Sequence, residues 1–193
     1  TERQGDTISE HDDENTIEGS NWGSQTFTNN AGTFAPYPLY VINLHGHRVG
    51  SPTTITVKIY AVDGSHKPTG AVLGYSAPVD ISALTTDTEG ENIEIPFTGV
   101  GSASRYIAAS TEYAIVIYSA SSSPNAFHWQ ATSGDPIANS YGWVSADGGS
   151  SWSAAGLSGD SDFIFGTRGK VGTAFSLIGH KVAYTGTLGF TSP

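Results

Sequence analysis

Two histidines separated by a single glycine, His45 and His47, have the spacing in this sequence that comes nearest to a metal site. Side chains two positions apart in a strand point to the same face, so both imidazoles could reach one ion. A zinc site needs three or four protein ligands, and neither an H-E-x-x-H segment nor an evident third ligand accompanies this pair. We therefore predict outward-facing strand histidines, no bound metal and no other cofactor.

The residue patterns that would indicate an enzyme are missing from the sequence. A glycosidase needs two carboxyl groups facing each other across a fixed gap, but the carboxylates beyond the N-terminal segment lie mostly in turn contexts, as Asp63 and Asp87 do. No serine occupies a G-x-S-x-G turn, and no helix follows the glycine-rich segment 99–102 as a phosphate-binding loop would require. The absence of cysteine excludes thiolate chemistry and disulfides. We predict a protein without catalytic activity.

The aromatic residues are better candidates for binding. Trp129, Tyr141 and Trp143 lie close together in the sequence near expected loops, with Asp135 between them. Sugar-binding β-sandwiches offer flat aromatic faces to pyranose rings, and neighbouring polar groups fix the orientation of the sugar. In the alternative interpretation, Trp129 and Trp143 fill the core. The sequence leaves both interpretations open.

Charge is scarce and unevenly distributed. Charged residues make up 13% of the chain, the net charge is −10, and residues 1–20 contain seven of the 18 carboxylates. This balance disfavours nucleic-acid binding, which requires a basic surface to displace counterions. Asp12, Asp13 and Glu14 lack the spacing of a calcium loop, so residues 1–21 are predicted to be a solvated acidic arm. No apolar run approaches the roughly 18 residues needed to span a bilayer.

The elements that must position these residues are short strands. Residues 54–61 alternate between apolar and polar side chains, with Ile55, Val57 and Ile59 expected to face inward. Residues 113–118 are apolar on both faces and predict a central, fully covered strand. Low charge, abundant Ser, Thr and Gly, and the absence of a helical period predict an all-β fold. We expect a jelly-roll-like β-sandwich of about eight antiparallel strands with extended terminal segments.

We divide the chain into an acidic arm (1–21), a β-sandwich domain (22–169) and a strand-like C-terminal extension (170–193). The extension has several large apolar side chains interrupted by glycines, which weaken any self-contained hairpin. Left in water these side chains would invite aggregation, so they must pair with a sheet edge of their own subunit or of a neighbour. The predicted assembly residues are Phe175, Leu177, Ile178, Val182, Tyr184, Leu188 and Phe190.

A set of core and turn segments that begins with IYAVDG at 59–64 and KPTG at 67–70 resembles β-sandwich modules of secreted bacterial surface proteins and of phage tail and virion proteins. The resemblance covers about residues 22–168 and is a pattern of core and turn positions, so it implies a fold more than an activity. Its elements are IYAVDG at 59–64, KPTG at 67–70, Leu73, TEYAIV at 111–116, Trp129, Tyr141 and DF at 162–163.

The segment SADGGSSW at 145–152 is similar to the Asp-box, a hairpin turn known from sialidase propellers and other secreted β-proteins. The resemblance implies that Asp147 accepts hydrogen bonds from backbone N–H groups and that Trp152 packs on the hairpin, with Ser145 and Gly149 completing the turn. Sialidases contain several such boxes and an arginine cluster. This chain has one box without that cluster, so the motif is predicted to be structural.

Together these features predict a non-enzymatic structural subunit of an extracellular fibre or virion-like assembly. Its subunits would be linked into a homopolymer by strand addition of a terminal segment. The alternative is a carbohydrate-binding or adhesion module that recognises glycans. Both hypotheses place the protein outside the cell, on a cell surface or on a virion, and the N-terminus fits removal of a signal peptide.

Overall fold

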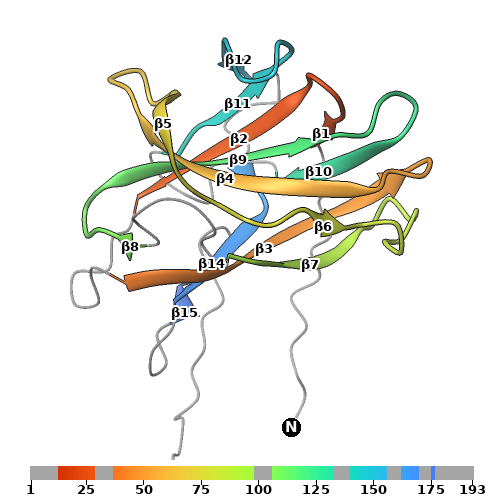
Figure 1. Ribbon diagram of the computed structural model, residues 1–193, viewed down its shortest axis with the longest axis horizontal. Coiled ribbons are helices and arrows are strands. Elements are labelled where there is room, and N and C mark those ends of the chain that lie inside the picture. The colour runs from red at the N-terminus through yellow and green to blue at the C-terminus, as the bar shows by residue number, and fades with distance from the viewer. Residues whose placement is uncertain are drawn as a thin grey trace, which may run out of the picture.

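The computed structural model describes residues 13–28, 37–97, 106–132, 140–155, 162–169 and 175–176. Within these ranges the chain forms strands β1 to β15 and no helix. It follows that no described segment is a helix long and apolar enough to cross a membrane. All strand pairings are antiparallel and build two sheets, which lie as two layers in Figure 1.

The eight-stranded sheet contains strands from both ends of the described chain. Its strand order is β1 (Asp13–Ile17), β10 (Ala126–Thr132), β3 (Tyr37–Val49), β14 (Phe165–Gly169) and β15 (Phe175–Ser176). The short β13 (Asp162–Phe163) pairs with β10, while β7 (Glu91–Pro96) and β8 (Tyr106–Ile107) pair with β3.

The seven-stranded sheet forms the opposite layer. Its strand order is β12 (Ser153–Ala154), β11 (Gly142–Ser145), β2 (Trp22–Thr28), β9 (Glu112–Ser119), β4 (Thr54–Val62) and β5 (Pro68–Tyr75), and β6 (Val79–Asp80) pairs with β4. From β1 to β4 the chain alternates between the two sheets. The predicted all-β sandwich is confirmed, with additional strands of only two residues.

The strands predicted at 54–61 from alternation and at 113–118 from apolar residues on both faces correspond to β4 and β9. Ile55, Val57 and Ile59 of β4 are buried in the core, as their period of two predicts. β9 lies between β2 and β4, and both Ile115 and its neighbour Val116 are fully buried although they face opposite sides of the sheet. The prediction of a central strand covered on both faces is therefore confirmed.

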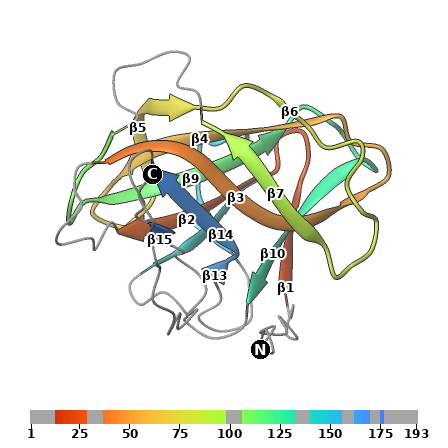
Figure 2. The ribbon, with the colours of Figure 1, turned by 90° about the horizontal axis from the view of Figure 1, so that it is seen from below.

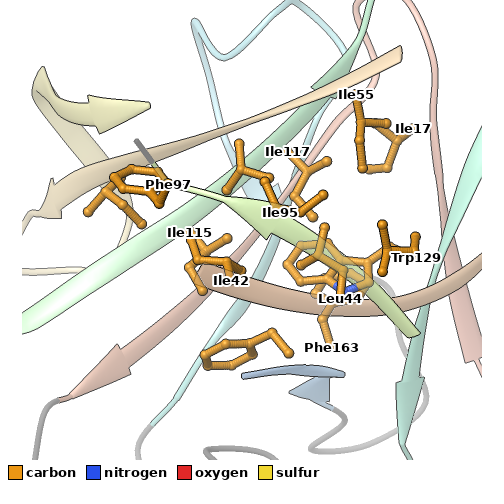
Figure 3. Close-up of a cluster of buried hydrophobic side chains, with 14 of the residues drawn as sticks. Ile17, Ile42, Leu44, Ile55, Ile95, Phe97, Ile115, Ile117, Trp129 and Phe163 are labelled. Carbon is orange, nitrogen blue, oxygen red and sulfur yellow. The ribbon is translucent and has the colours of Figure 1, made fainter. Parts of the chain in front are cut away.

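The core fills the space between the layers with branched and aromatic side chains (Figure 3). Trp129 of β10 is fully buried and stacks on Phe163, with 4.4 Å between the ring centroids. Its indole nitrogen donates a hydrogen bond to the backbone oxygen of Ile164 at 2.9 Å, so the polar atom of this large side chain is satisfied inside the protein.

The predicted domain boundary at residue 22 is too late. Residues 13–17 form β1, which pairs with β10 along its whole length, from Asp13 opposite Ala131 to Ile17 opposite Phe127. Ile17 is fully buried in the core (Figure 3). A strand with one apolar residue escapes a hydrophobic-pattern search because backbone pairing, rather than side-chain burial, holds most of it in the sheet.

The C-terminal extension reaches the eight-stranded sheet of its own chain. Phe175 pairs with Arg168 and Ser176 pairs with Thr167, so the backbone of β15 joins β14 within one molecule. This is the first of the two pairings considered for the extension. The other predicted assembly residues lie outside the described residues: Leu177, Ile178, Val182, Tyr184, Leu188 and Phe190.

Candidate functional site

Two turns from distant parts of the sequence stand on the outer face of the seven-stranded sheet. One joins β4 to β5 and the other joins β11 to β12, and both rise above β4, β9 and β2 in Figure 1. Between the two turns lies a groove of about 230 Å³. The groove is lined by Trp22, Tyr60, Pro68, Thr69, Gly70, Gly149, Ser150 and Trp152.

The indole of Trp22 forms one wall of the groove and is held on several sides. It stacks on Tyr118 with 4.9 Å between ring centroids, and its Nε1 donates a hydrogen bond to the backbone oxygen of Gly19 at 3.1 Å. The Lys58 ammonium lies 4.8 Å from the centroid of the Trp22 ring and 4.4 Å from that of Tyr118. These contacts fix the orientation of the ring before any ligand arrives.

The turn at 145–152 builds the rest of that wall through hydrogen bonds to Asp147. Asp147 Oδ1 accepts from the backbone nitrogens of Ser150 at 3.0 Å and Ser151 at 2.9 Å, and Oδ2 accepts from the Ser151 hydroxyl at 2.6 Å. These hydrogen bonds, together with one from the Ser145 hydroxyl, lower the pKa of Asp147 to about 2. The Ser145 hydroxyl oxygen also accepts from the backbone nitrogen of Gly149 at 2.8 Å.

The opposite wall belongs to the β4–β5 hairpin, whose turn is tied down by Asp63. The Asp63 carboxylate accepts hydrogen bonds from the backbone nitrogens of Lys67 at 3.0 Å and Ser65 at 2.8 Å, which lowers the pKa of Asp63. The hairpin then places Pro68, Thr69 and Gly70 opposite Trp22, with Tyr60 beside them. Both walls are therefore built by turns that an aspartate stabilises.

Tyr141 and Trp143 lie next to this groove and do not line it. The β4–β5 turn crosses over the sheet to reach them: His66 stacks on Tyr141 at 4.2 Å, and the Lys67 ammonium lies 5.1 Å from the Trp143 ring centroid. His66 Nδ1 also lies 2.8 Å from Oε2 of Glu112 in β9, and this contact holds the turn against the sheet. We call these four side chains, His66, Lys67, Tyr141 and Trp143, the aromatic bridge.

The aromatic bridge explains why the floor of this face is closed. Ser24, Thr26, Ala114 and Val116 project outward from β2 and β9, yet all four are fully buried. Strands β9 and β2 separate β4 from β11, so a turn that touches both β4 and β11 must pass over them. The groove therefore lies beside a part of this sheet face whose outward side chains are covered.

The residues of the predicted ligand platform do not lie together in the structure. Trp129 is a core residue, which settles the alternative in favour of packing for this side chain. Tyr141, 37% exposed, and Trp143 belong to the aromatic bridge on the outer surface. Asp135 lies outside the described residues. The groove aromatics Trp22, Tyr60 and Trp152 were missed as a group, although the alternation in β4 already placed Tyr60 on the outer face.

The paired histidines of β3 face away from the core, as predicted, but they are covered by the segment between β6 and β7. His45 is held at both ring nitrogens, with Nδ1 3.0 Å from Oδ1 of Asn92 and Nε2 3.1 Å from the backbone oxygen of Glu89. His47 is only 2% exposed, and this burial lowers its pKa. His47 therefore favours the neutral imidazole.

Comparisons with protein-family models, with curated proteins and with solved structures gave no match. The function is accordingly inferred from the geometry of the described residues.

Proposed function

We propose that this protein is a carbohydrate-binding or adhesion module, and that its glycan occupies the groove between the β4–β5 hairpin and the turn at 145–152. The observation that carries the proposal is the set of aromatic rings, Trp22, Tyr60 and Trp152, around one open groove of about 230 Å³. Each of these three side chains is only partly buried.

Sugars suit such a groove because a pyranose ring has one face rich in C–H groups and an edge rich in hydroxyls. The C–H face packs on the negatively charged face of an aromatic ring, and the hydroxyls need nearby donors and acceptors. Thr69 and Ser150 supply hydroxyl groups at opposite walls, and Gly70 and Gly149 expose backbone groups without side-chain obstruction. Because Trp22 is already held by Tyr118 and Lys58, binding orders few side chains.

Size and charge narrow the class of glycan. The groove is smaller than the roughly 300–1,000 Å³ typical of sites for drug-sized ligands, so it suits one or two sugar rings at the end of a glycan. A net charge of −10 repels polyanionic chains at long range. We therefore propose an uncharged oligosaccharide as the ligand.

Trp152→Ala and Tyr60→Ala test the proposal on a glycan array and by titration calorimetry with the best ligand. Each variant should lower affinity at least about tenfold, because a truncated aromatic anchor is a typical hot spot. Tyr40→Ala is the matched control, since Tyr40 is a half-buried tyrosine on the other sheet. The proposal fails if the wild-type protein binds no glycan, or if both groove variants bind as the control does.

A second candidate function is the structural subunit of an extracellular fibre or virion-like assembly. The observation that favours it is the position of β15, which ends the strand order of the eight-stranded sheet. A terminal strand at a sheet edge leaves backbone groups that can pair with another copy, and a head-to-tail pairing of this kind need not close. A location outside the cell or on a virion suits both candidate functions.

A further inference from the structure

The outer face of the eight-stranded sheet brings together three side chains that the sequence keeps far apart. His47 of β3 lies directly opposite His128 of β10 in the strand register. Glu14 of β1 is paired with Gln130, two positions from His128 on the same face of β10. The three strands lie side by side in Figure 2. One potential ligand atom from each side chain lies within 4.8 Å of the other two.

The two separations that involve Glu14 lie close to those between ligands of one ion, and the shorter is also a hydrogen-bond distance. Glu14 Oε1 lies 2.6 Å from His128 Nδ1, and Oε2 lies 3.8 Å from His47 Nε2, which is beyond hydrogen-bond range. Ligand atoms about 2.0–2.1 Å from a tetrahedral zinc ion are about 3.3 Å apart, between these two distances. The Glu14 side chain is 41% exposed, so its carboxylate has room to rotate. Such a rotation can make its distances to the two histidine nitrogens more nearly equal.

An independent observation concerns His47. Its side chain is 3% exposed, its Nε2 is the nitrogen nearest the Glu14 carboxylate, and its other nitrogen, Nδ1, has no hydrogen-bond partner among the described residues. A buried imidazole normally uses both ring nitrogens, as His45 on the same strand does. The His47 ring also faces the His128 ring, with 5.0 Å between centroids.

We propose that Glu14, His47 and His128 form a binding site for a divalent transition-metal ion of the zinc class. Two imidazoles and one carboxylate are the nitrogen and oxygen donors that zinc accepts, whereas calcium and magnesium prefer oxygen ligands alone. His128 is 17% exposed and Glu14 more so, which gives the ion an entry path from solvent. Asp87, in the segment over His47, adds a further negative charge near the site.

Such an ion would connect the N-terminal strand to the body of the sheet. β1 ends the strand order of the eight-stranded sheet and pairs along its length with β10 alone. Ligands from β1, β10 and β3 would join three adjacent strands through one ion, and binding only to the folded state stabilises that state. The site would therefore hold β1 to β10 and β3, and it is separate from the groove on the other sheet.

Titration calorimetry with zinc chloride and the absorption spectrum of the cobalt-loaded protein test this proposal. The wild-type chain should bind one ion, show the visible bands of tetrahedral cobalt, and melt at a higher temperature with zinc than with calcium or magnesium. Glu14→Gln keeps the side chain's shape at an exposed position, so it should fold normally and bind zinc at least about tenfold more weakly. His128→Gln should behave in the same way.

His66→Gln is the matched control, since His66 is a histidine paired with a glutamate on the opposite sheet. It should leave the zinc affinity and the cobalt spectrum unchanged. Absence of stoichiometric zinc binding by the wild-type chain would overturn the proposal. Wild-type affinity in both Glu14→Gln and His128→Gln would also overturn it, because the ion would then be bound elsewhere.

Discussion

Gly149 lies against the indole of Trp22 so closely that a Cβ atom at this position would be 2.7 Å from Cζ3 of the ring. Gly149 also has a φ of +83°, a conformation that L side chains rarely adopt. The turn at 145–152 and the wall residue Trp22 are therefore fitted to each other, and the groove keeps its shape only with glycine here.

Gly149→Ala should destabilise the protein by about 1–3 kcal/mol, because it adds both backbone strain and a clash with Trp22. Gly64→Ala is the control, since nothing lies within 4 Å of a Cβ at Gly64. Urea unfolding of the two variants measures the difference. Equal midpoints for the two variants would contradict the close fit between the turn and the indole.

Ile115→Ala should cost about 2–5 kcal/mol, since it removes a fully buried side chain from the central strand β9. Val49→Ala is a control at an apolar residue that is 39% exposed, and its effect should stay within about 0.5 kcal/mol. Chemical denaturation reports both values. A loss below about 1 kcal/mol for Ile115→Ala would show that this strand is not central to the core.

Asp147→Asn should remove a pH-dependent part of the stability. The pKa of Asp147 is about 2 in the folded protein, below the ordinary value of 3.8, chiefly because of its hydrogen bonds to Ser151. A depressed folded-state pKa stabilises the protein above the unfolded pKa, and the contribution is lost as the pH falls through the folded pKa. Thermal melts should therefore show the wild-type advantage over Asp147→Asn above pH 4 and lose it near pH 2. An advantage that does not change over this range would contradict the assignment.

The assembly hypothesis predicts that truncation after Gly169 yields monomers, while the full chain forms a homopolymer. The truncation removes β15 and the predicted assembly residues beyond it, but it keeps the pairing of β14 with β3. Light scattering and negative-stain electron microscopy of both proteins measure their size. A full chain that stays monomeric at high concentration, or a truncated chain that still forms fibres, would rule out the C-terminal segment as the donor.

Local sequence patterns are sufficient to determine part of this structure. The alternation at 54–61 placed Ile55 inward and Tyr60 outward, because the two-residue period of a strand depends only on neighbouring residues. The hydrogen bonds of Asp147 to Ser150 and Ser151 are equally local, spanning three and four residues. The all-β sandwich followed from many such segments taken together.

Tertiary structure alone decided which outward faces meet and which apolar residues lie in the core. Trp129 and Trp143 gave the same signal in sequence, yet one is fully buried and the other lies in the aromatic bridge, because strand order assigns each strand to a layer. Glu14 and His128 are 114 residues apart and become neighbours through the pairing of β1 with β10. Sheet order depends on backbone pairing between distant segments, and local sequence patterns contain little information about it.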